Sequence, residues 1–186
     1  CENQEEIAWY MRSTYAIEHL KHQKHNPNYL SSVTFDTTKL KLTNDINEAV
    51  AYADYVIFVV PSAFLSKELE SLTESLEDKI IFSAIKGIVP ESSLIVGEHF
   101  HTKYNIPFEN IGVITGPCHA EEVAMERLSY LTIACSDRKK AKYVATNLSS
   151  HYIKAKTTDD IIGTEYAAVL KNIYAIAAGI AHGLGY

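Results

Sequence analysis

Apolar runs alternate with helix-like segments along most of the chain. Short β-branched apolar runs predict strands, and apolar residues spaced three to four apart predict helices. The expected strands are 6–12, 39–42, 55–60, 79–83, 111–114, 129–135 and 152–157. The expected helices are 14–25, 46–53, 66–76, 94–104, 119–126, 137–148 and 165–180. This alternation predicts an α/β fold with an open, mostly parallel sheet.

The last expected helix, 165–180, is apolar on almost every side. Between Glu165 and His182 the only formal charge is Lys171. One face is bulky and is expected to pack on something large, since a helix apolar all round is typically buried. The opposite face leaves room for a ligand or another backbone, because small residues surround Lys171: Ala167, Ala168, Ala175, Ala178 and Gly179.

Lys171 has two interpretations from the sequence alone. If the helix is buried, the ammonium is expensive to desolvate, and burial lowers a lysine's pKa towards the range useful for proton transfer. The neighbouring Asn172 could then donate or accept a hydrogen bond. Alternatively, the side chain extends from a half-buried helix and keeps its ammonium in water.

Three expected strands end in segments suited to ligand contact: 61–62, 84–87 and 115–118. Open α/β sheets bind ligands beyond the carboxyl ends of their strands, so these segments are expected at one edge. Each would present small residues and backbone N–H groups there, and Lys86 adds a positive charge. An ordinary turn remains the alternative for each segment taken alone.

Composition narrows the classes of function. The chain has 186 residues, 47% hydrophobic and 22% charged, which is enough for one sizeable core. Its formal net charge of -6 argues against non-specific nucleic-acid binding, yet permits a local basic pocket for a phosphorylated small molecule. Cys1, Cys118 and Cys135 form neither a disulfide framework nor a metal motif, which favours a reducing, cytoplasmic location. The histidines have no metal-ligand spacing, and no membrane span is expected.

A dinucleotide-binding fold would carry G-x-G-x-x-G after its first strand, and this sequence has none. The sequence also begins without Met, at Cys1. We therefore expect a Rossmann-like sheet whose first strand and glycine turn are missing. Segment 6–12 would then be the second strand, and Arg12 at its end favours the extra phosphate of NADP. An exposed arginine without a ligand is the alternative.

Four sequence blocks together resemble bacterial NAD(P)-dependent glycerol-3-phosphate dehydrogenase, in the same order and with similar gaps. They are V-V-P-S at 59–62, A-I-K-G at 84–87, I-T-G-P-C-H-A-E-E-V-A at 114–124 and V-L-K-N-I-Y-A-I-A-A-G at 169–179. The resemblance covers essentially the whole chain. It implies a dinucleotide-binding domain at 1–158, incomplete here, and the start of a helical substrate domain at 159–186.

The resemblance also implies a reaction and its residues. Hydride would pass between NADP or NAD and dihydroxyacetone phosphate, giving sn-glycerol 3-phosphate, a precursor of membrane phospholipids. Lys171 matches the proton donor and acceptor, and Lys86 matches a lysine that contacts both substrate and cofactor. The remaining matches are Asn172, which would orient substrate, Gly116 and Cys118, which would contact it, and Pro61 and Ala120, which would contact the cofactor together with Arg12 at the end of the expected second strand.

The sequence departs from the family's pattern in three ways. Position 118 is usually Ser or Thr and is Cys here, a weaker hydrogen-bonding group. The glycine-rich turn is absent, and so are the later Asp and Arg-Asn pair of the substrate site. We therefore expect an internal fragment that is inactive alone, with unpaired strand edges and a tendency to self-associate. A homodimer is a further expectation.

Two other functions stay open at this point. One is another β-hydroxyacid dehydrogenase, such as a 6-phosphogluconate-type enzyme, which often shares a catalytic lysine. The other is a non-catalytic α/β assembly module, in which helix 165–180 is a dimer interface and Lys171 is incidental.

Overall fold

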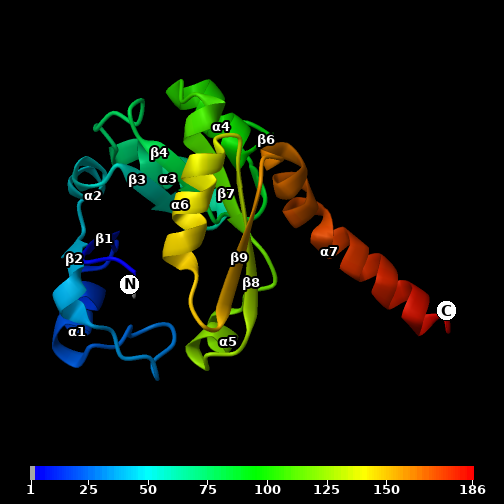
Figure 1. The fold of residues 1–186 in the computed structure, drawn as a ribbon, viewed down its shortest axis with the longest axis horizontal. Coiled ribbons are helices and arrows are strands. Elements are labelled where there is room, and N and C mark those ends of the chain that lie inside the picture. Colours follow the sequence, from blue (N-terminus) through cyan, green and yellow to red (C-terminus); the bar gives the residue numbers. More distant parts are fainter. Residues whose placement is uncertain (1–2) are drawn as a thin grey trace.

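The computed structural model describes residues 3–186 and has a mixed, mostly parallel sheet at its centre (Figure 1). The strands are β1 (Ile7–Tyr10), β2 (Leu40–Thr43), β3 (Tyr55–Phe58), β4 (Ile80–Ser83), β5 (Ile88–Val89), β6 (Leu94–Ile95), β7 (Ile111–Thr115), β8 (Ser129–Cys135) and β9 (Ile153–Thr158). The helices are α1 (Thr14–Gln23), α2 (Ile46–Tyr52), α3 (Ser62–Glu68), α4 (Val96–Tyr104), α5 (Ala120–Ala124), α6 (Arg138–Leu148) and α7 (Ile161–Gly183). The order of the central sheet is β3-β4-β7-β8-β9, which confirms the expected α/β class.

Alternate side chains of the central sheet support helices on its two faces. On β4, Ile81 is fully buried in a cluster with Leu65 of α3 and Phe100 of α4. The next residue, Phe82, points to the other face and packs in a cluster with Val144 of α6. Because successive strand residues face opposite ways, the two clusters make a three-layer arrangement of helix, sheet and helix.

The strands β3, β4 and β7 are adjacent and parallel. Their carboxyl ends therefore lie at one edge, as the sequence analysis expected for segments 61–62, 84–87 and 115–118. The segments after β3 and β4 lie close together, because a Cβ built on Gly87 would be only 2.8 Å from Oγ of Ser62.

The strands β1 and β2 form a separate parallel pair, and β1 has no second partner among residues 3–186. On its side, β3 pairs with β4 alone. The pair lies apart from the central sheet in Figure 1. The expectation of unpaired strand edges is thus confirmed within residues 3–186, and Ile57 on β3 and Val59 just after it are 43% and 70% exposed.

The strand β8 runs antiparallel to β7, which the apolar pattern did not indicate. After β7 the chain turns at Gly116 and forms the short helix α5 beside the same end of the sheet (Figure 1). It then returns along β7 instead of crossing over the sheet, and β9 pairs parallel to β8 after the crossover helix α6.

The expected helix 66–76 is wrong in position, because α3 begins directly after Pro61 and ends at Glu68. Part of the reason is Asn47, whose Oδ1 accepts hydrogen bonds from the N–H groups of Thr73 and Glu74 at 2.7 and 3.0 Å. These bonds hold that segment against α2. The short pair β5–β6 was also not expected, and it delays the start of α4 to Val96.

The helix α7 begins at Ile161, where Oδ1 of Asp160 accepts a hydrogen bond from Gly163 N at 2.7 Å. Its first turns pack on the central domain, and the rest projects away from the sheet (Figure 1). Ile173, Ile176 and Ile180 are 60%, 65% and 59% exposed, so the expectation of a buried helix is wrong for the described chain. No helix within residues 3–186 is long and apolar enough to cross a bilayer.

Candidate active site

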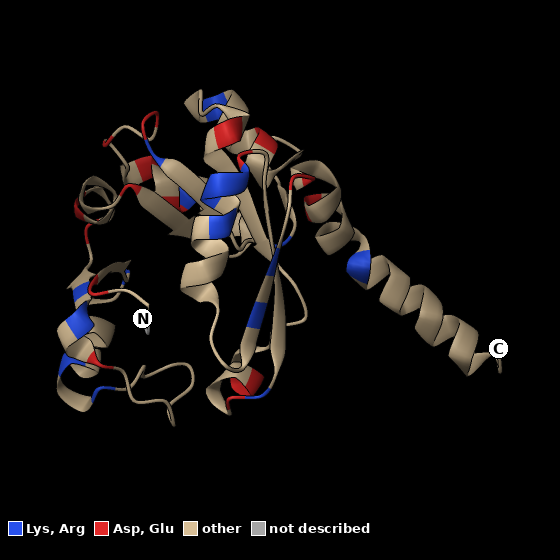
Figure 2. Cartoon of the chain, in the orientation of Figure 1, with Lys and Arg blue, Asp and Glu red and all other residues tan. Residues whose placement is uncertain are grey.

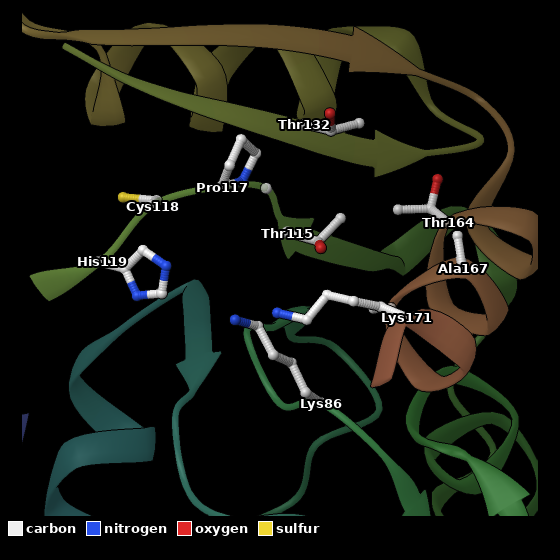
Figure 3. Close-up of a pocket in the computed structure, with 11 residues that line it drawn as sticks. Lys86, Thr115, Pro117, Cys118, His119, Thr132, Thr164, Ala167 and Lys171 are labelled. Atoms are coloured by element: carbon white, nitrogen blue, oxygen red, sulfur yellow. The ribbon is translucent and has the colours of Figure 1, made fainter. Parts of the chain in front are cut away.

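A cavity of about 450 Å³ opens at the carboxyl edge of the central sheet, beside α7 (Figure 3). This volume falls within the usual range for small-molecule sites. Segments distant in sequence meet here, because the lining residues are Lys86, Thr115, Gly116, Pro117, Cys118, His119, Thr132, Thr164, Ala167, Ala168 and Lys171.

Lys86 is held at the cavity by its two neighbours in the turn after β4. Ile85 is buried, and its N–H donates to Oγ of Ser83 at 3.1 Å. Gly87 follows with a φ of +116°, a conformation that favours glycine. With one neighbour anchored in the core and the other turning the backbone sharply, the Lys86 side chain points into the open space.

The turn after β7 depends on Gly116. Its φ is +140°, and a Cβ at this position would collide with the backbone carbonyl oxygen of Tyr130 on β8. The N–H of Cys118 donates to the carbonyl of Gly116 at 3.0 Å, which closes the turn. Cys118 is half-buried and lines the cavity with His119.

One stripe of α7 faces the cavity: Thr164, Ala167, Ala168 and Lys171. Their spacing of three, four and seven residues places them on one side of the helix. The expectation that the small residues beside Lys171 leave room for a ligand is therefore confirmed for Ala167 and Ala168. Ala175, Ala178 and Gly179 lie further along the helix and do not line the cavity.

Lys171 is exposed, which agrees with the second of its two interpretations, a side chain that keeps its ammonium in water. The physical reason is that α7 leaves the domain near this residue. Lys171 nevertheless lies at the site, and Figure 3 shows its amine and that of Lys86 ending side by side in the same space, one reaching in from α7 and the other from the turn after β4. Within residues 3–186, no carboxylate forms an ion pair with either amine.

Two unpaired ammonium groups facing one cavity favour an anionic or oxygen-rich ligand. The charge view agrees, because α7 carries one basic residue, Lys171, and its one acidic residue, Glu165, lies closer to the start of the helix (Figure 2). Either lysine could donate a hydrogen bond to a ligand oxygen, and a lysine can also transfer a proton.

The site also contains two hydroxyl groups that were not predicted, those of Thr132 and Thr164. Thr132 is the register partner on β8 of Thr115, which belongs to the predicted segment 115–118, and Thr164 lies in the first turn of α7. The pairing of Thr115 with Thr132 depends on β8 returning antiparallel to β7. Without that reversal, nothing in the apolar pattern would bring the hydroxyls of Thr115 and Thr132 together.

The other predicted site residues lie outside the cavity. Arg12 follows β1, and its Nη1 donates to Oε1 of Glu68 at 3.0 Å. Pro61 precedes α3, Ala120 begins α5, and Asn172 is exposed next to Lys171. Their predicted contacts with cofactor or substrate stay predictions.

Cysteine and histidine chemistry adds little to the site. Cys118 and Cys135 are free thiols, and Cys1 lies outside the described residues. Within the described range, no three His, Cys, Asp or Glu side chains gather as a ligand set for a metal ion.

Protein-family models match two segments of the chain. The model described as NAD-dependent glycerol-3-phosphate dehydrogenase N-terminus matches residues 1–141. The model described as NAD-dependent glycerol-3-phosphate dehydrogenase C-terminus matches residues 160–186. The gap between the two segments contains most of α6 and all of β9.

Curated relatives agree with the family models. Glycerol-3-phosphate dehydrogenase (NAD(P)+) from Streptococcus uberis is 33% identical to this chain, covering 100% of this chain and 55% of the relative. The enzyme of the same name from Streptococcus equi subsp. zooepidemicus is 37% identical, covering 87% of this chain and 48% of the relative. The chain thus spans about half the length of the curated relatives it matches.

Solved structures show the same fold. Glycerol-3-phosphate dehydrogenase from Coxiella burnetii is 25% identical with a TM-score of 0.79, covering 96% of this chain and 54% of that one. Glycerol-3-phosphate dehydrogenase from Plasmodium falciparum has a TM-score of 0.85 at 24% identity, covering 96% and 51%. These likenesses confirm the Rossmann-like class of fold.

Proposed function

We propose a dehydrogenase function for this chain, which belongs to the NAD-dependent glycerol-3-phosphate dehydrogenase family. The reaction is the interconversion of dihydroxyacetone phosphate and sn-glycerol 3-phosphate with NADP or NAD, which supplies phospholipid synthesis. The observation that carries the proposal is the meeting of Lys86 and Lys171 at one cavity, although they lie far apart in the sequence.

Lys171 is the proton donor in the proposed reduction. A bound reduced nicotinamide supplies the hydride, with its two electrons, to the carbonyl carbon. As the carbonyl π bond breaks, negative charge grows on the oxygen, and the Lys171 ammonium transfers a proton to it. In the reverse direction, the neutral amine of Lys171 accepts the hydroxyl proton. Positioned proton transfer of this kind contributes about 10²–10⁴-fold to a rate.

Lys86 stabilises the developing oxyanion from the turn after β4. Because this turn already places Lys86 at the cavity, its ammonium can interact with the growing charge. The Cys118 turn bounds the same space, and we assign to Asn172, which lies next to Lys171 but outside the cavity, the role of orienting the substrate through its amide. The hydroxyl groups of Thr115 and Thr132 are further partners for substrate oxygens.

The dinucleotide fits the carboxyl edge of β3, β4 and β7. At this edge Gly87 packs against Ser62, so the ends of β3 and β4 lie close together there. Pro61, Lys86 and Ala120 are the residues we assign to the cofactor at this edge. Arg12 would need to release Glu68 before it could bind the extra phosphate of NADP.

Several further assignments rest on the same family. Residues 1–158 form the dinucleotide-binding part, and residues 159–186 begin the substrate-binding part. The protein acts in the cytoplasm, forms a homodimer and does not bind nucleic acid.

The two alternatives are weaker. A 6-phosphogluconate-type enzyme shares the catalytic lysine, but the family models and the curated relatives point to glycerol-3-phosphate. An assembly module would give no reason for Lys86 and Lys171 to meet at one cavity.

The test measures kinetics in a chimera, in which residues 1–186 replace the matched segment of the Streptococcus uberis enzyme. The Lys171→Ala variant should lose about 10²–10⁴-fold in kcat for dihydroxyacetone phosphate reduction, with the Kd for NADPH unchanged. The matched control is Lys142→Ala, which removes an exposed lysine of α6 on the other face of the sheet and should keep the parent kcat. An unchanged kcat in Lys171→Ala would refute the proposal.

A substrate comparison separates the enzyme classes. The chimera should reduce dihydroxyacetone phosphate and fail to oxidise 6-phosphogluconate, whereas the reverse preference would favour the alternative enzyme. The 186-residue chain assayed by itself is expected to show negligible turnover. A rate near that of the Streptococcus uberis enzyme would contradict this expectation.

A further inference from the structure

Glu165 is a buried acid that the proposed reaction does not use. Its residue exposure is 4%, and within residues 3–186 it forms no ion pair with a basic side chain. Its Oε2 accepts a hydrogen bond from the backbone N–H of Gly97 at 2.9 Å. Because burying a carboxyl group is costly unless it is compensated, this contact calls for an explanation.

The carboxyl group caps α4 from a distant part of the chain. Helix α4 begins after Ile95, whose apolar side chain cannot accept a hydrogen bond from the free N–H groups of the first turn. Glu165, 68 residues away in sequence, accepts one of them instead. A negatively charged group is also favourable at the start of a helix.

Gly97 provides the space for this contact. A Cβ built on Gly97 would lie 2.8 Å from Oε2 of Glu165, closer than real Cβ contacts. The obstacle would be the far end of a flexible side chain, so a methyl group at position 97 would push the carboxyl group away from its donor. The fit between the two residues is therefore specific and can be broken from either side.

Two contacts fix the direction of α7 on the domain. Ile161 is buried in a cluster with Val113 and Ala134, and Glu165 joins α4 one helical turn later. From Lys171 to Ile180 the helix is exposed throughout. Glu165 is therefore the last buried anchor before Lys171.

Because Lys171 lies well beyond Glu165 along α7, a small tilt of the helix at Glu165 would move Lys171 appreciably. At 1.5 Å per residue, Lys171 lies about 9 Å further along the axis, so a tilt of about 10° would move it by about 1.5 Å. A misplacement of about 1 Å at a reacting group can cost about 10²-fold in rate.

We propose that Glu165 is a positioning residue, whose buried contact with the start of α4 sets the direction of α7 and so keeps the Lys171 amine beside that of Lys86. The role in catalysis rests on the proposed function, whereas the positioning itself concerns the folded chain alone. An oxygen acceptor at position 165 is what the contact requires, so glutamine should replace it.

The experiment measures the proximity of the two amines in the 186-residue chain. A short amine-reactive cross-linker is applied, and the Lys86–Lys171 cross-link is quantified by mass spectrometry relative to single-end modification of each lysine. Glu165→Ala and Gly97→Ala should each lower the ratio several-fold, and Glu165→Gln should keep it within about twofold of the parent chain. Gly97→Ala keeps the carboxyl group and introduces a better helix former, so it remains informative if Glu165→Ala fails to fold.

The matched control is Glu70→Ala, which removes an exposed acid far from α7 in sequence and should leave the ratio unchanged. An unchanged ratio in Gly97→Ala would overturn the proposal, and so would a loss in Glu165→Gln as large as in Glu165→Ala. In the chimera, Gly97→Ala should lower kcat with little effect on the Kd for NADPH. If Lys171→Ala leaves kcat unchanged while the cross-link results hold, the proposed function fails and the positioning role stands.

Discussion

Gly116 is the residue on which the shape of the site most depends. Its φ of +140° is strained for any L residue, and a Cβ would meet the carbonyl oxygen of Tyr130 on the adjacent strand. We expect Gly116→Ala to lower the free energy of unfolding by at least about 2 kcal/mol, because the backbone of β8 cannot easily move aside. Urea denaturation of the 186-residue chain measures this change.

Gly179→Ala is the control for that substitution. A Cβ at Gly179 has no atom within 4 Å, and the residue lies in the exposed part of α7. The change should stabilise the helix by up to about 1 kcal/mol. Equal effects of the two substitutions would show that the Gly116 turn is not strained as described.

Glu165 should make the stability of the chain depend on pH. Burial raises the pKa of its carboxyl group from 4.5 to about 7, while the Gly97 N–H opposes the shift. The folded state therefore binds the proton more tightly than the unfolded state. This contribution to stability is fully present below pH 4.5 and is lost as the pH rises to about 7, a change of about 3 kcal/mol.

Glu165→Gln isolates this effect, because glutamine accepts the same hydrogen bond without ionising. The free energy of unfolding of the parent chain, minus that of the variant, should fall by about 2.5 kcal/mol between about pH 5 and about pH 8. Glu98 faces the same contact from α4 and raises the pKa of Glu165 by charge repulsion, but it is present in both proteins. Parallel stability curves for the two proteins would contradict the prediction.

Sequence motifs predicted the reactive and turn residues of the site, but not the tertiary contacts that hold them in place. Lys86, Gly116, Cys118 and Lys171 were all predicted, and all line the cavity. Glu165 was expected only as the first residue of the last helix. Its burial depends on α4 packing beside α7, a tertiary contact that a residue pattern along one helix cannot indicate.

At the scale of elements, α7 shows what amphipathicity can and cannot predict. The pattern correctly indicated a long helix with one small face and one bulky face. It also favoured burial, because a bulky apolar face is stable only against other apolar groups. A pattern identifies which face is apolar and not what covers it, and within residues 3–186 nothing covers Ile173, Ile176 or Ile180.

The exposed bulky face of α7 should cause self-association. Contiguous apolar side chains on a surface are favoured to leave water by contact with one another. The 186-residue chain should therefore show a sedimentation coefficient that rises with concentration, and Ile176→Glu should weaken this dependence. The control is Lys142→Glu on α6, which changes charge in the same direction on an exposed surface. A parent chain that stays monomeric at every concentration would contradict the prediction.

At the scale of the whole molecule, the class of fold followed from the alternation of strands and helices. The expectation of unpaired strand edges came from the absence of a G-x-G-x-x-G motif in the sequence. The structure then shows β1 and β3 each paired on one side only. The reversed direction of β8 was beyond the apolar pattern, because periodicity records burial and not strand direction.

The two-stranded sheet β1–β2 and the central sheet β3-β4-β7-β8-β9 should differ in local stability. A pair of strands is marginal alone, and β1–β2 depends on contacts with the rest of the chain, such as Tyr10 packing against the main core and Arg12 pairing with Glu68. Strand β7 is paired on both sides, and Ile111 at its start is fully buried. Opening of β1–β2 therefore breaks fewer contacts than opening of the central sheet.

Hydrogen exchange followed by mass spectrometry measures this difference. Peptides that contain β1 and β2 should exchange their amide hydrogens well before peptides that contain β4 and β7, under conditions where the chain stays folded. Arg12→Ala should accelerate exchange in β1 and β2 and leave β7 unchanged, because it removes a contact between the two parts. Lys142→Ala, which removes a charge on α6, should leave both rates unchanged. Equal protection of the two sheets would show that the chain unfolds as a single cooperative unit, and the gap between β1 and β3 would then have no cost in local stability.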